Sequence, residues 1–382
     1  MAKQDFSLFE TQLDERAKSA RERILVARER DCGNVIDLST NDYLCLAQNE
    51  AVKASAIAAV EKWGASASAS PLVTGYKAIH AQLERALCEW IGFECGLIWN
   101  TGFAANCAVL GTLPQRDDLI LADRLIHNSM INGILKSGAR FQRFCHNDLA
   151  HLRQLLEKNQ NYKNIFVAVE SVYSMDGDSP DLRELTILRE EFGFVLIVDE
   201  AHATGWFGEN GGGLVQALGL QKNVDILVGT LGKSLGAAGA YTLFNDEILR
   251  RYLINFASEF IYSTYLPPAA AGAALGAIEV VKNFSPRERE AMPALSKKWR
   301  EAIRTIVPAT DCTLTSPVIS IILGEENKML EAAKILKNAG FIVGAIRPPT
   351  IPAGTSRLRI SLNRNLSDTS RERFCAVLKS VL

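Results

Sequence analysis

Short runs of continuously apolar residues alternate with longer stretches of helical periodicity from about residue 50 to residue 245. Apolar runs of this length, bounded by turn residues, predict strands that are buried on both faces of a sheet. Helices between such strands indicate right-handed βαβ units, so we expect an α/β fold with a mostly parallel central sheet flanked by helices. The five runs are GLIW (96–99), LILA (119–122), IFVAV (165–169), FVLIV (194–198) and DILVG (225–229).

The pattern changes on both sides of this central region. Residues 5–30 carry apolar side chains at helical spacing among many charges, which predicts an amphipathic surface helix, and residues 35–46 predict a strand followed by a turn. An Ala-rich stretch predicts a helix over 269–282. Beyond it, residues 290–382 alternate two predicted helices with short strands. These strands are expected at 316–323 and 356–362. The expected parts are an N-terminal helix and strand segment (1–45), a large domain (46–282) and a small C-terminal α/β domain (283–382).

Composition narrows the possible function classes. The chain of 382 residues is 48% hydrophobic and 22% charged, which is ordinary for a soluble globular protein. A net charge of −1 argues against a large nucleic-acid-binding face, which would be basic. We find no apolar run long enough to span a membrane and no secretory signal, so a cytoplasmic location is expected.

Eight cysteines are present, and none of them forms a C-x-x-C pair or a cluster with zinc-ligand spacing. We therefore expect buried, reduced thiols and no metal site. The cysteines lie at positions 32, 45, 88, 95, 107, 145, 312 and 375.

Polar residues follow each predicted strand, where parallel sheets bind their ligands. A glycine turn at Gly102 enters a helix whose free N–H groups favour a phosphate. His127 follows the second run, although a lone histidine in a loop is more often structural. Asp199 and His202 follow the fourth run, and capping of a neighbouring loop is the alternative for Asp199. Lys233 follows the fifth run, among glycines and small residues.

The stretch GTLGKSLG around Lys233 is not a nucleotide-binding P-loop. That motif needs a glycine five residues before the Gly-Lys pair, at the position held by Leu227. Together, a lysine, a buried carboxylate, histidines and a helix N-terminus instead fit pyridoxal phosphate (PLP). The lysine amine would bond the aldehyde, and the carboxylate would keep the pyridine nitrogen protonated so that the ring draws electrons.

The chain resembles the α-oxoamine synthases, in the class II aminotransferase group of fold-type I PLP enzymes. The resemblance covers nearly the whole chain, from STNDYL (39–44) to RPPTIPAGTSRLRISL (347–362). The closing block points to the branch that makes 8-amino-7-oxononanoate. The other matching blocks are TGFAAN, ADRLIHNS, RFCHND, ESVYSMDGD, VDEAHATGWFGENGGG, GTLGKSLG and IYSTYLPP.

The resemblance implies roles for individual residues around the cofactor. Lys233 matches the lysine that forms the Schiff base, and Asp199 matches the partner of the pyridine nitrogen. His127 matches the histidine stacked on the ring, and His202 the one that touches the ring hydroxyl. Further matches to cofactor-binding positions are Ser174, Thr230, Gly102 and Phe103, the last two in the phosphate-holding turn.

The resemblance also implies partners. Thr264 matches a residue that reaches the phosphate from the other subunit, so a homodimer with shared active sites is implied. Asn41 and Arg359 match positions near the substrate, with Arg359 gripping the amino-acid carboxylate through its planar guanidinium. Arg357 shares a strand face with Arg359, so periodicity cannot separate the two. Arg23 is a candidate for a distal carboxylate, against the alternative of a solvated helix face.

The activity implied by this resemblance is the decarboxylative condensation of L-alanine with a pimeloyl thioester, with Lys233 as general base. The acyl carrier, CoA or acyl-carrier protein, stays open. The products would be 8-amino-7-oxononanoate, CO2 and free thiol, in biotin biosynthesis. One stretch departs from the family: residues 64–72 read GASASASPL where relatives are glycine-rich and end in His or Arg, so the acyl chain also stays open.

Several alternatives remain at this stage. Three enzymes share the chemistry but take other substrates: 2-amino-3-ketobutyrate CoA ligase, 5-aminolevulinate synthase and autoinducer synthases. A PLP aminotransferase or lyase would need no thioester. A non-catalytic subunit of the same fold would be expected to lack the Schiff-base lysine, and Lys233 is present.

Overall fold

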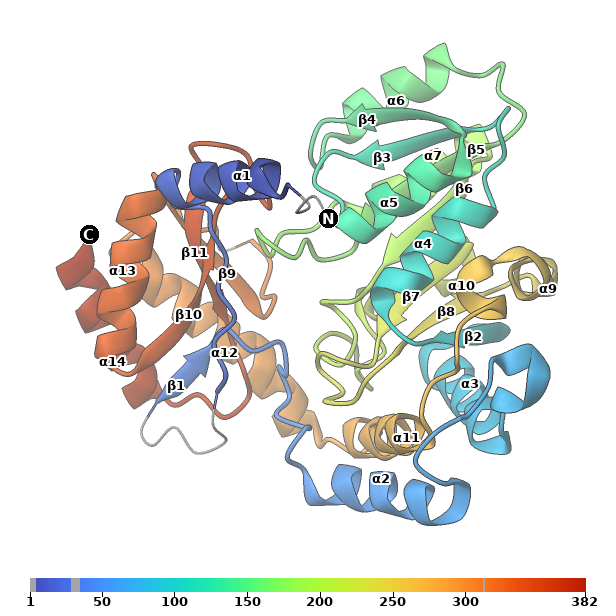
Figure 1. Cartoon of the computed structure of the whole chain (residues 1–382), viewed down its shortest axis with the longest axis horizontal. Helices are drawn as coiled ribbons and strands as arrows, with labels where there is room; N and C mark the ends of the chain where they lie inside the picture. The colour runs from blue at the N-terminus through green and yellow to red at the C-terminus, as the bar shows by residue number, and fades with distance from the viewer. Residues whose placement is uncertain (1–4, 29–34, 312) are drawn as a thin grey trace.

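The chain folds into two lobes, each built around its own β-sheet (Figure 1). The structure is a computed structural model that describes residues 5–28, 35–311 and 313–382. The sheet of the large lobe has the strand order β2-β8-β7-β6-β5-β3-β4, and that of the small lobe has the order β1-β10-β11-β9. The α/β class and the mostly parallel central sheet predicted from the apolar runs are confirmed.

All five predicted runs form strands of the large sheet. Two further strands were not predicted. β4 is an edge strand with exposed arginines, so it lacks the apolar signal of a central strand. β8 is fully buried and antiparallel to both of its neighbours. The strands are β2 (Cys95–Trp99), β3 (Leu119–Asp123), β4 (Arg140–Phe144), β5 (Ile165–Glu170), β6 (Val195–Asp199), β7 (Ile226–Thr230) and β8 (Ala240–Phe244).

Helices cover the large sheet, and the predicted Ala-rich helix is among them as α11. α11 packs closely on α2, because a side chain at Gly272 would come within 2.5 Å of Ala59 Cβ. The α-helices are α2 (Glu50–Trp63), α3 (Ala78–Ile91), α4 (Gly102–Thr112), α5 (Asn128–Ser137), α6 (Leu149–Lys158), α7 (Leu182–Phe192), α8 (Leu214–Ala217), α9 (Glu247–Phe256), α10 (Ser258–Ile261) and α11 (Pro268–Lys282).

The small lobe takes one strand from the N-terminal segment, because β1 pairs in parallel with β10. Two helices were predicted for residues 290–382. That prediction is wrong: three helices lie in or reach into this range, and β10 was missed. The elements are β1 (Ile36–Leu38), β9 (Val318–Gly324), β10 (Phe341–Ile346), β11 (Ser356–Ser361), α12 (Pro286–Arg304), α13 (Glu326–Asn338) and α14 (Asp368–Val381).

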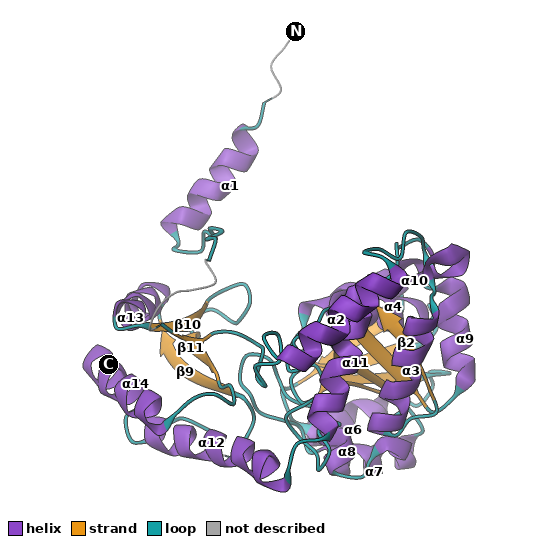
Figure 2. Cartoon of the chain, turned by 90° about the horizontal axis from the view of Figure 1, so that it is seen from below, coloured by secondary structure: helices purple, strands orange, loops and turns teal. Residues whose placement is uncertain are grey.

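The N-terminal helix is shorter than predicted. α1 spans Ser7–Lys18 rather than 5–30, and Ala20 has a left-handed φ of 55°, which a helix cannot continue through. The helix has no buried residue, and Figure 2 shows it standing apart from both sheets. Arg21, just beyond it, forms an ion pair of 2.8 Å with Glu326 of α13.

The cysteine prediction is confirmed in part. The six described cysteines form no disulfide bond. Of these six, only Cys107 is buried, Cys145 is exposed and the others are half-buried. Cys32 and Cys312 lie outside the described residues. Within the described ranges, no helix is both long and apolar enough to cross a membrane.

Candidate active site

Polar side chains converge at the carboxyl ends of the central strands, where the sequence predicted a site. Glu170 at the end of β5 and Asp199 at the end of β6 are direct neighbours in the parallel register. Both side chains are buried. Lys233 follows β7, the next strand across the sheet, by three residues. The neighbouring parallel strands thus bring two carboxylates and an amine together at their carboxyl ends.

A chain of hydrogen bonds starts at Lys233. Its Nζ lies 2.7 Å from His202 Nε2, and His202 Nδ1 lies 2.6 Å from the hydroxyl of Tyr43. With a pKa of about 8, Lys233 is mostly an ammonium at neutral pH and can only donate, so Nε2 of neutral His202 accepts from it and Nδ1 carries the ring proton. The Tyr43 hydroxyl then accepts from Nδ1 and is free to donate to Asn41 Oδ1 at 3.1 Å. Burial, together with the nearby cations, lowers the pKa of His202 well below its usual range, which agrees with this assignment.

The electrostatics around Lys233 favour proton transfer near neutral pH. Burial of the amine lowers the pKa of Lys233 to about 8, although Asp199 and Glu170 oppose that shift. Burial, with the charge of Asp199 beside it, raises the pKa of Glu170 to about 8. The raised pKa favours the protonated form of Glu170, which lessens the repulsion between this carboxyl group and Asp199. Glu170 was not singled out from the sequence, although it begins the quoted block ESVYSMDGD.

Asp199 is held in place by a second network. Its Oδ2 accepts a hydrogen bond of 2.7 Å from Asn106 Nδ2, and its Oδ1 accepts from the backbone N–H of Ala201 at 2.8 Å. Asn106 also donates to Ser129 Oγ, which lies 2.7 Å from His127 Nδ1. The His127 ring is therefore anchored through Nδ1 while its residue stays exposed. A ring held in this way could stack on a flat cofactor, which stays a prediction.

The predicted phosphate turn lies at the start of α4. Thr101 caps the helix by accepting from the N–H of Ala104 at 3.1 Å, and Gly102 and Phe103 are the first two helical residues. Their N–H groups have no carbonyl within the helix to bind. A side chain at Gly102 would meet only Thr230 Cβ, at 3.9 Å, so the space before the helix is bounded by Thr230. Such a helix end attracts an anion.

The structure distinguishes Arg357 from Arg359, which the strand periodicity could not do. Arg359 donates to Ser174 O at 2.6 Å, to Asn41 Oδ1 at 3.1 Å and to the Tyr43 hydroxyl at 3.2 Å, all neutral acceptors. Arg357 instead forms an ion pair with Asp176. Among the described residues no carboxylate neutralises Arg359. Its buried guanidinium is therefore the one suited to an anionic ligand.

Not every predicted residue joins these networks. Thr264 is exposed, and its carbonyl accepts from Asn100 Nδ2 at 2.6 Å. Its role toward a second subunit stays a prediction. Arg23 donates to Thr350 Oγ1 at 3.0 Å, on the loop between β10 and β11, so the structure does not bring it to Lys233. Tyr43 and Asn106 were missed, although both stand in blocks quoted for the family resemblance.

The loop that departs from the family is strained at one position. Ser68 has a left-handed φ of 66°, a conformation that glycine adopts at less cost. Gly75 is needed where it stands, because a side chain there would come within 2.0 Å of Ala69 O. Leu72, in place of the usual His or Arg, is exposed together with Val73.

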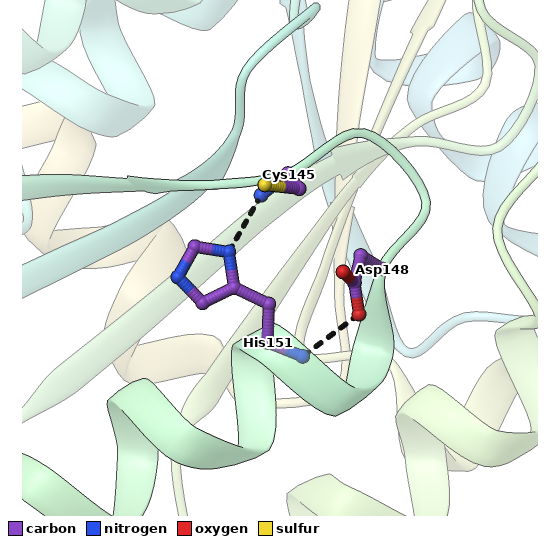
Figure 3. A group of neighbouring side chains, drawn as sticks. All are labelled: Cys145, Asp148 and His151. Carbon is purple, nitrogen blue, oxygen red and sulfur yellow. Dashed lines mark hydrogen bonds between the residues drawn. The ribbon is translucent and has the colours of Figure 1, made fainter.

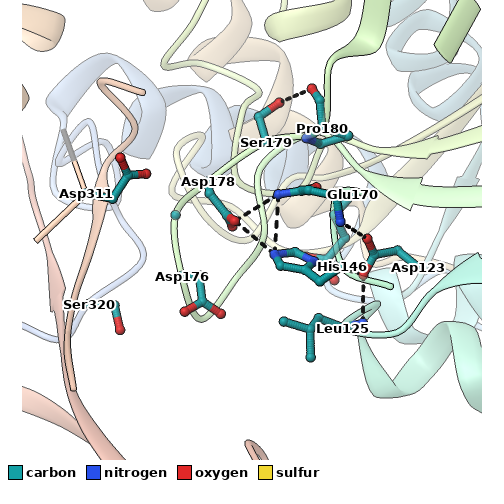
Figure 4. Close-up of polar contacts among 12 residues, drawn as sticks. Asp123, Leu125, His146, Glu170, Asp176, Asp178, Ser179, Pro180, Asp311 and Ser320 are labelled. Atoms are coloured by element: carbon teal, nitrogen blue, oxygen red, sulfur yellow. Dashed lines mark hydrogen bonds and ion pairs between the residues drawn. The ribbon is translucent and has the colours of Figure 1, made fainter. Parts of the chain in front are cut away.

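A cluster of charged side chains, His146, Asp123 and Asp178, connects the loop before His127 with the loop that contains Ser174. His146 lies 2.9 Å from Asp123 Oδ1 and 2.9 Å from Asp178 Oδ2, as Figure 4 shows. Burial alone would lower the pKa of His146, but the hydrogen bonds and charges of the two aspartates outweigh it and raise the pKa to about 10. Asp123 Oδ1 also accepts from the N–H of Leu125, two residues before His127.

We expect the His146→Gln variant to lose stability mainly at neutral and low pH. A raised pKa means that the protonated histidine stabilises the fold fully below pH 6.5, its ordinary pKa, and that this contribution fades as the pH rises through about 10. Denaturant unfolding of both proteins between pH 6 and pH 10.5 measures the difference. A constant gap across that range would show that His146 does not act through its charge.

Among the residues that the structure describes, one group of side chains has metal-ligand chemistry: Cys145, Asp148 and His151 (Figure 3). Two of its donor atoms already have partners. Asp148 Oδ1 caps α6 by accepting from the N–H of His151 at 2.8 Å, and His151 Nδ1 accepts from the N–H of Cys145 at 3.1 Å. The group is thus accounted for as a closed helix cap.

The residues at the strand ends fit PLP. Lys233 offers an amine to an aldehyde, Asp199 a fixed carboxylate to a pyridinium, and the α4 N-terminus two N–H groups to a phosphate. The backbone beside the lysine is open, because a side chain at Gly232 would find its nearest neighbour at 3.6 Å.

Comparisons with known proteins bear on the family and on the cofactor. The family model for aminotransferase class I and II matches residues 33–378. The 8-amino-7-oxononanoate synthase of Anaeromyxobacter dehalogenans (strain 2CP-1) is 40% identical, over 91% of this chain and 86% of its own length.

Two solved structures share the fold over nearly their whole length. Serine palmitoyltransferase from S. paucimobilis with bound PLP and myriocin has a TM-score of 0.92 at 25% identity, covering 99% of this chain and 98% of its own. The 8-amino-7-oxononanoate synthase from Francisella tularensis has a TM-score of 0.76 at 29% identity, covering 91% and 97%. The chain therefore belongs to the aminotransferase class I and II family of PLP enzymes.

Proposed function

We propose that this protein condenses L-alanine with a pimeloyl thioester, carried by CoA or acyl-carrier protein, and releases 8-amino-7-oxononanoate, CO2 and the free thiol. The observation that carries the proposal is the link between Lys233 and Arg359 through His202 and Tyr43. One end of this series of hydrogen bonds is the amine of Lys233, which can exchange with a substrate amine. The other end is an unneutralised guanidinium. An α-amino acid has the matching amine and carboxylate.

The comparisons support the class more strongly than the substrate. The curated relative is an 8-amino-7-oxononanoate synthase, whereas one of the structural neighbours is a serine palmitoyltransferase. The name of the structural neighbour states transfer of an acyl group to an amino acid, and the resemblance to the α-oxoamine synthases implies the same class of reaction for this chain. The assignment of L-alanine and the pimeloyl group rests on sequence identity and on the closing block of the chain, residues 347–362.

Each side chain has a separate task in the proposed reaction. Bound PLP supplies an aldehyde for the substrate amine and a ring that draws electrons from Cα. Arg359 holds the amino-acid carboxylate, and Lys233 removes the Cα proton and later returns one. Asp199 would stabilise the positive charge on the protonated pyridine nitrogen of the cofactor. In the overall change Cα bonds the thioester carbonyl, the C–S bond breaks, and the Cα–carboxylate bond breaks with loss of CO2.

The proton chain suits this use of Lys233. With its pKa lowered to about 8, the amine can both take and give a proton near neutral pH. Neutral His202 accepts from it at Nε2, and Tyr43 fixes the histidine tautomer from the other side. The lysine is therefore oriented without a second fixed positive charge in contact with its amine.

We propose that the active unit is a homodimer with shared sites, with Thr264 reaching the cofactor phosphate of the second copy. The exposure of Thr264 and of the neighbouring Tyr262 is in keeping with a contact there. Analytical ultracentrifugation of the wild type checks the dimer. Mixing Thr264→Val with an inactive Lys233→Ala copy then tests sharing, because heterodimers would regain one wild-type site.

A substrate panel tests the proposed reaction. We expect thiol release with L-alanine and pimeloyl-CoA or pimeloyl-acyl-carrier protein, and a kcat/KM at least about tenfold lower with glycine or L-serine, because an added or missing small group in a fitted site changes binding by 1–3 kcal/mol. Free thiol is followed with a chromogenic disulfide. A preference for glycine or serine would replace the substrate assignment with that of a sister enzyme, and no thiol release with any thioester would remove the acyltransferase class.

A further inference from the structure

The loop Ser174–Asp178 makes contacts in both lobes. It follows β5 of the large sheet, and its Asp178 binds His146 of that lobe. The carbonyl of Gly177 accepts from Ser316 Oγ at 2.6 Å, just before β9. Gly177 has a left-handed φ of 74°, and a side chain there would come within 2.2 Å of Val318 O. The loop is thus pressed against the backbone of the small lobe.

Two arginines of β11 meet this loop at two points. Ser174 O accepts from Arg359 Nε, while the carboxylate of Asp176 pairs with Arg357. The arginines are two residues apart on a strand, so their Cα atoms lie about 7 Å apart on the same face. The Arg357 side chain is only 5% exposed and that of Asp176 is 26% exposed. A pair of opposite charges this well shielded from water is attracted strongly.

The pairing has a consequence for Arg359. Asp176 is the acidic residue that the loop places beside the arginine face of β11. Within the described part of the chain, Arg359 is bound only by neutral oxygens. If Arg357 did not pair with Asp176, the Asp176 carboxylate could turn toward the guanidinium of Arg359. Arg359 would then be neutralised internally, and an external carboxylate would have to compete for it.

We propose that Arg357 is a positioning residue that keeps Asp176 away from Arg359, so that Arg359 stays oriented and unneutralised for the carboxylate of the amino-acid substrate. This inference rests on the proposed function, because it takes Arg359 to be the carboxylate-binding group. It differs from a purely mechanical tie between the lobes. If the ion pair only held the two lobes together, loss of either partner would weaken binding equally, whereas here loss of the arginine weakens binding and loss of the aspartate does not.

The test uses the holoenzyme and three variants, Arg357→Gln, Asp176→Asn and the double variant. Binding of L-alanine is followed by the change in visible absorption of the cofactor. We expect Arg357→Gln to raise the dissociation constant for L-alanine about tenfold, a size typical of coupled neighbouring charges. Asp176→Asn keeps wild-type affinity or binds more tightly, with a lower Tm because it leaves Arg357 buried without a counter-charge. The double variant recovers to within about threefold of wild type.

Two outcomes would overturn the inference: wild-type affinity in Arg357→Gln, or a double variant as weak as Arg357→Gln alone. The matched control is Arg189→Gln, which removes another partly buried arginine–aspartate pair, with Asp225, at the opposite end of the strands. It should lower Tm without changing L-alanine binding. The wild type is first titrated with L-alanine, glycine and L-serine. A preference for glycine or serine contradicts the proposed substrate, and the variants are then compared with that amino acid.

Discussion

Replacing Lys233 by alanine should abolish turnover while leaving the protein folded. We expect activity to fall about 10⁴-fold, because the variant loses both the group that bonds the cofactor and the general base at Cα. Stability should hold or rise. The lowered pKa of Lys233 shows that the fold disfavours its charged form, and alanine removes that cost. Steady-state thiol release and thermal unfolding measure the two effects.

The surface variant Lys222→Ala is the matched control, since Lys222 is solvent-exposed and forms a surface ion pair with Glu94. It should keep wild-type turnover. Mass spectrometry after borohydride reduction adds a direct readout, with the cofactor mass on the peptide containing Lys233 in the wild type. Near wild-type thiol release from Lys233→Ala, or a reduced cofactor attached to a different lysine, would contradict the assignment.

The second large effect is expected for Asp199→Asn. The amide removes the negative charge that Asp199 offers to the pyridine nitrogen, yet it can still accept from Asn106 or Ala201. We expect kcat to fall about 10²- to 10³-fold, the usual result of deleting one fixed electrostatic stabiliser. Cofactor content, read from absorption, should fall less than kcat, because Lys233 and the α4 N-terminus remain.

Asp225→Asn is the control for this change. Asp225 directly precedes β7, at the opposite end of the strands from Asp199, and it pairs with Arg189. Its variant should lose stability and keep its kcat. If Asp199→Asn retained wild-type kcat with full cofactor content, the carboxylate would have no part in the chemistry.

Much of the large lobe could be predicted from the sequence, because its central strands are buried on both faces and read as unbroken apolar runs. The same rule located the site, since Asp199 and Lys233 follow two of those runs. β4 escaped it for a physical reason. β4 lies at an edge and carries polar residues, so it shows no apolar signal. β10 reads FIVGAI, an apolar run like the five that were recognised, and it was overlooked although its signal is present in the sequence.

The links between the lobes could not be predicted in this way. Tyr43 meets His202, and Arg359 meets Ser174, across large distances in the sequence. Such contacts depend on how the two sheets face each other, which local periodicity does not encode. The family resemblance supplied Arg359 and Asn41, but the choice between Arg359 and Arg357 required the ion pair with Asp176.

The residue at which α1 ends could not be predicted from the sequence pattern either. Apolar and charged residues continue past Lys18 at a spacing that suits a helix, yet the chain turns at Ala20 through a left-handed conformation. Helices without a buried face have little tertiary support, so their length is poorly determined by periodicity.

The most direct test of the proposed reaction compares two products in one experiment. The wild-type holoenzyme is given L-alanine labelled in its carboxyl carbon, together with pimeloyl-CoA, and both labelled CO2 and free CoA thiol are measured over time. Decarboxylative condensation predicts that the two appear in equal amounts and that neither appears without the thioester. Release of thiol without CO2, or conversion of L-alanine to pyruvate without release of thiol, would contradict it.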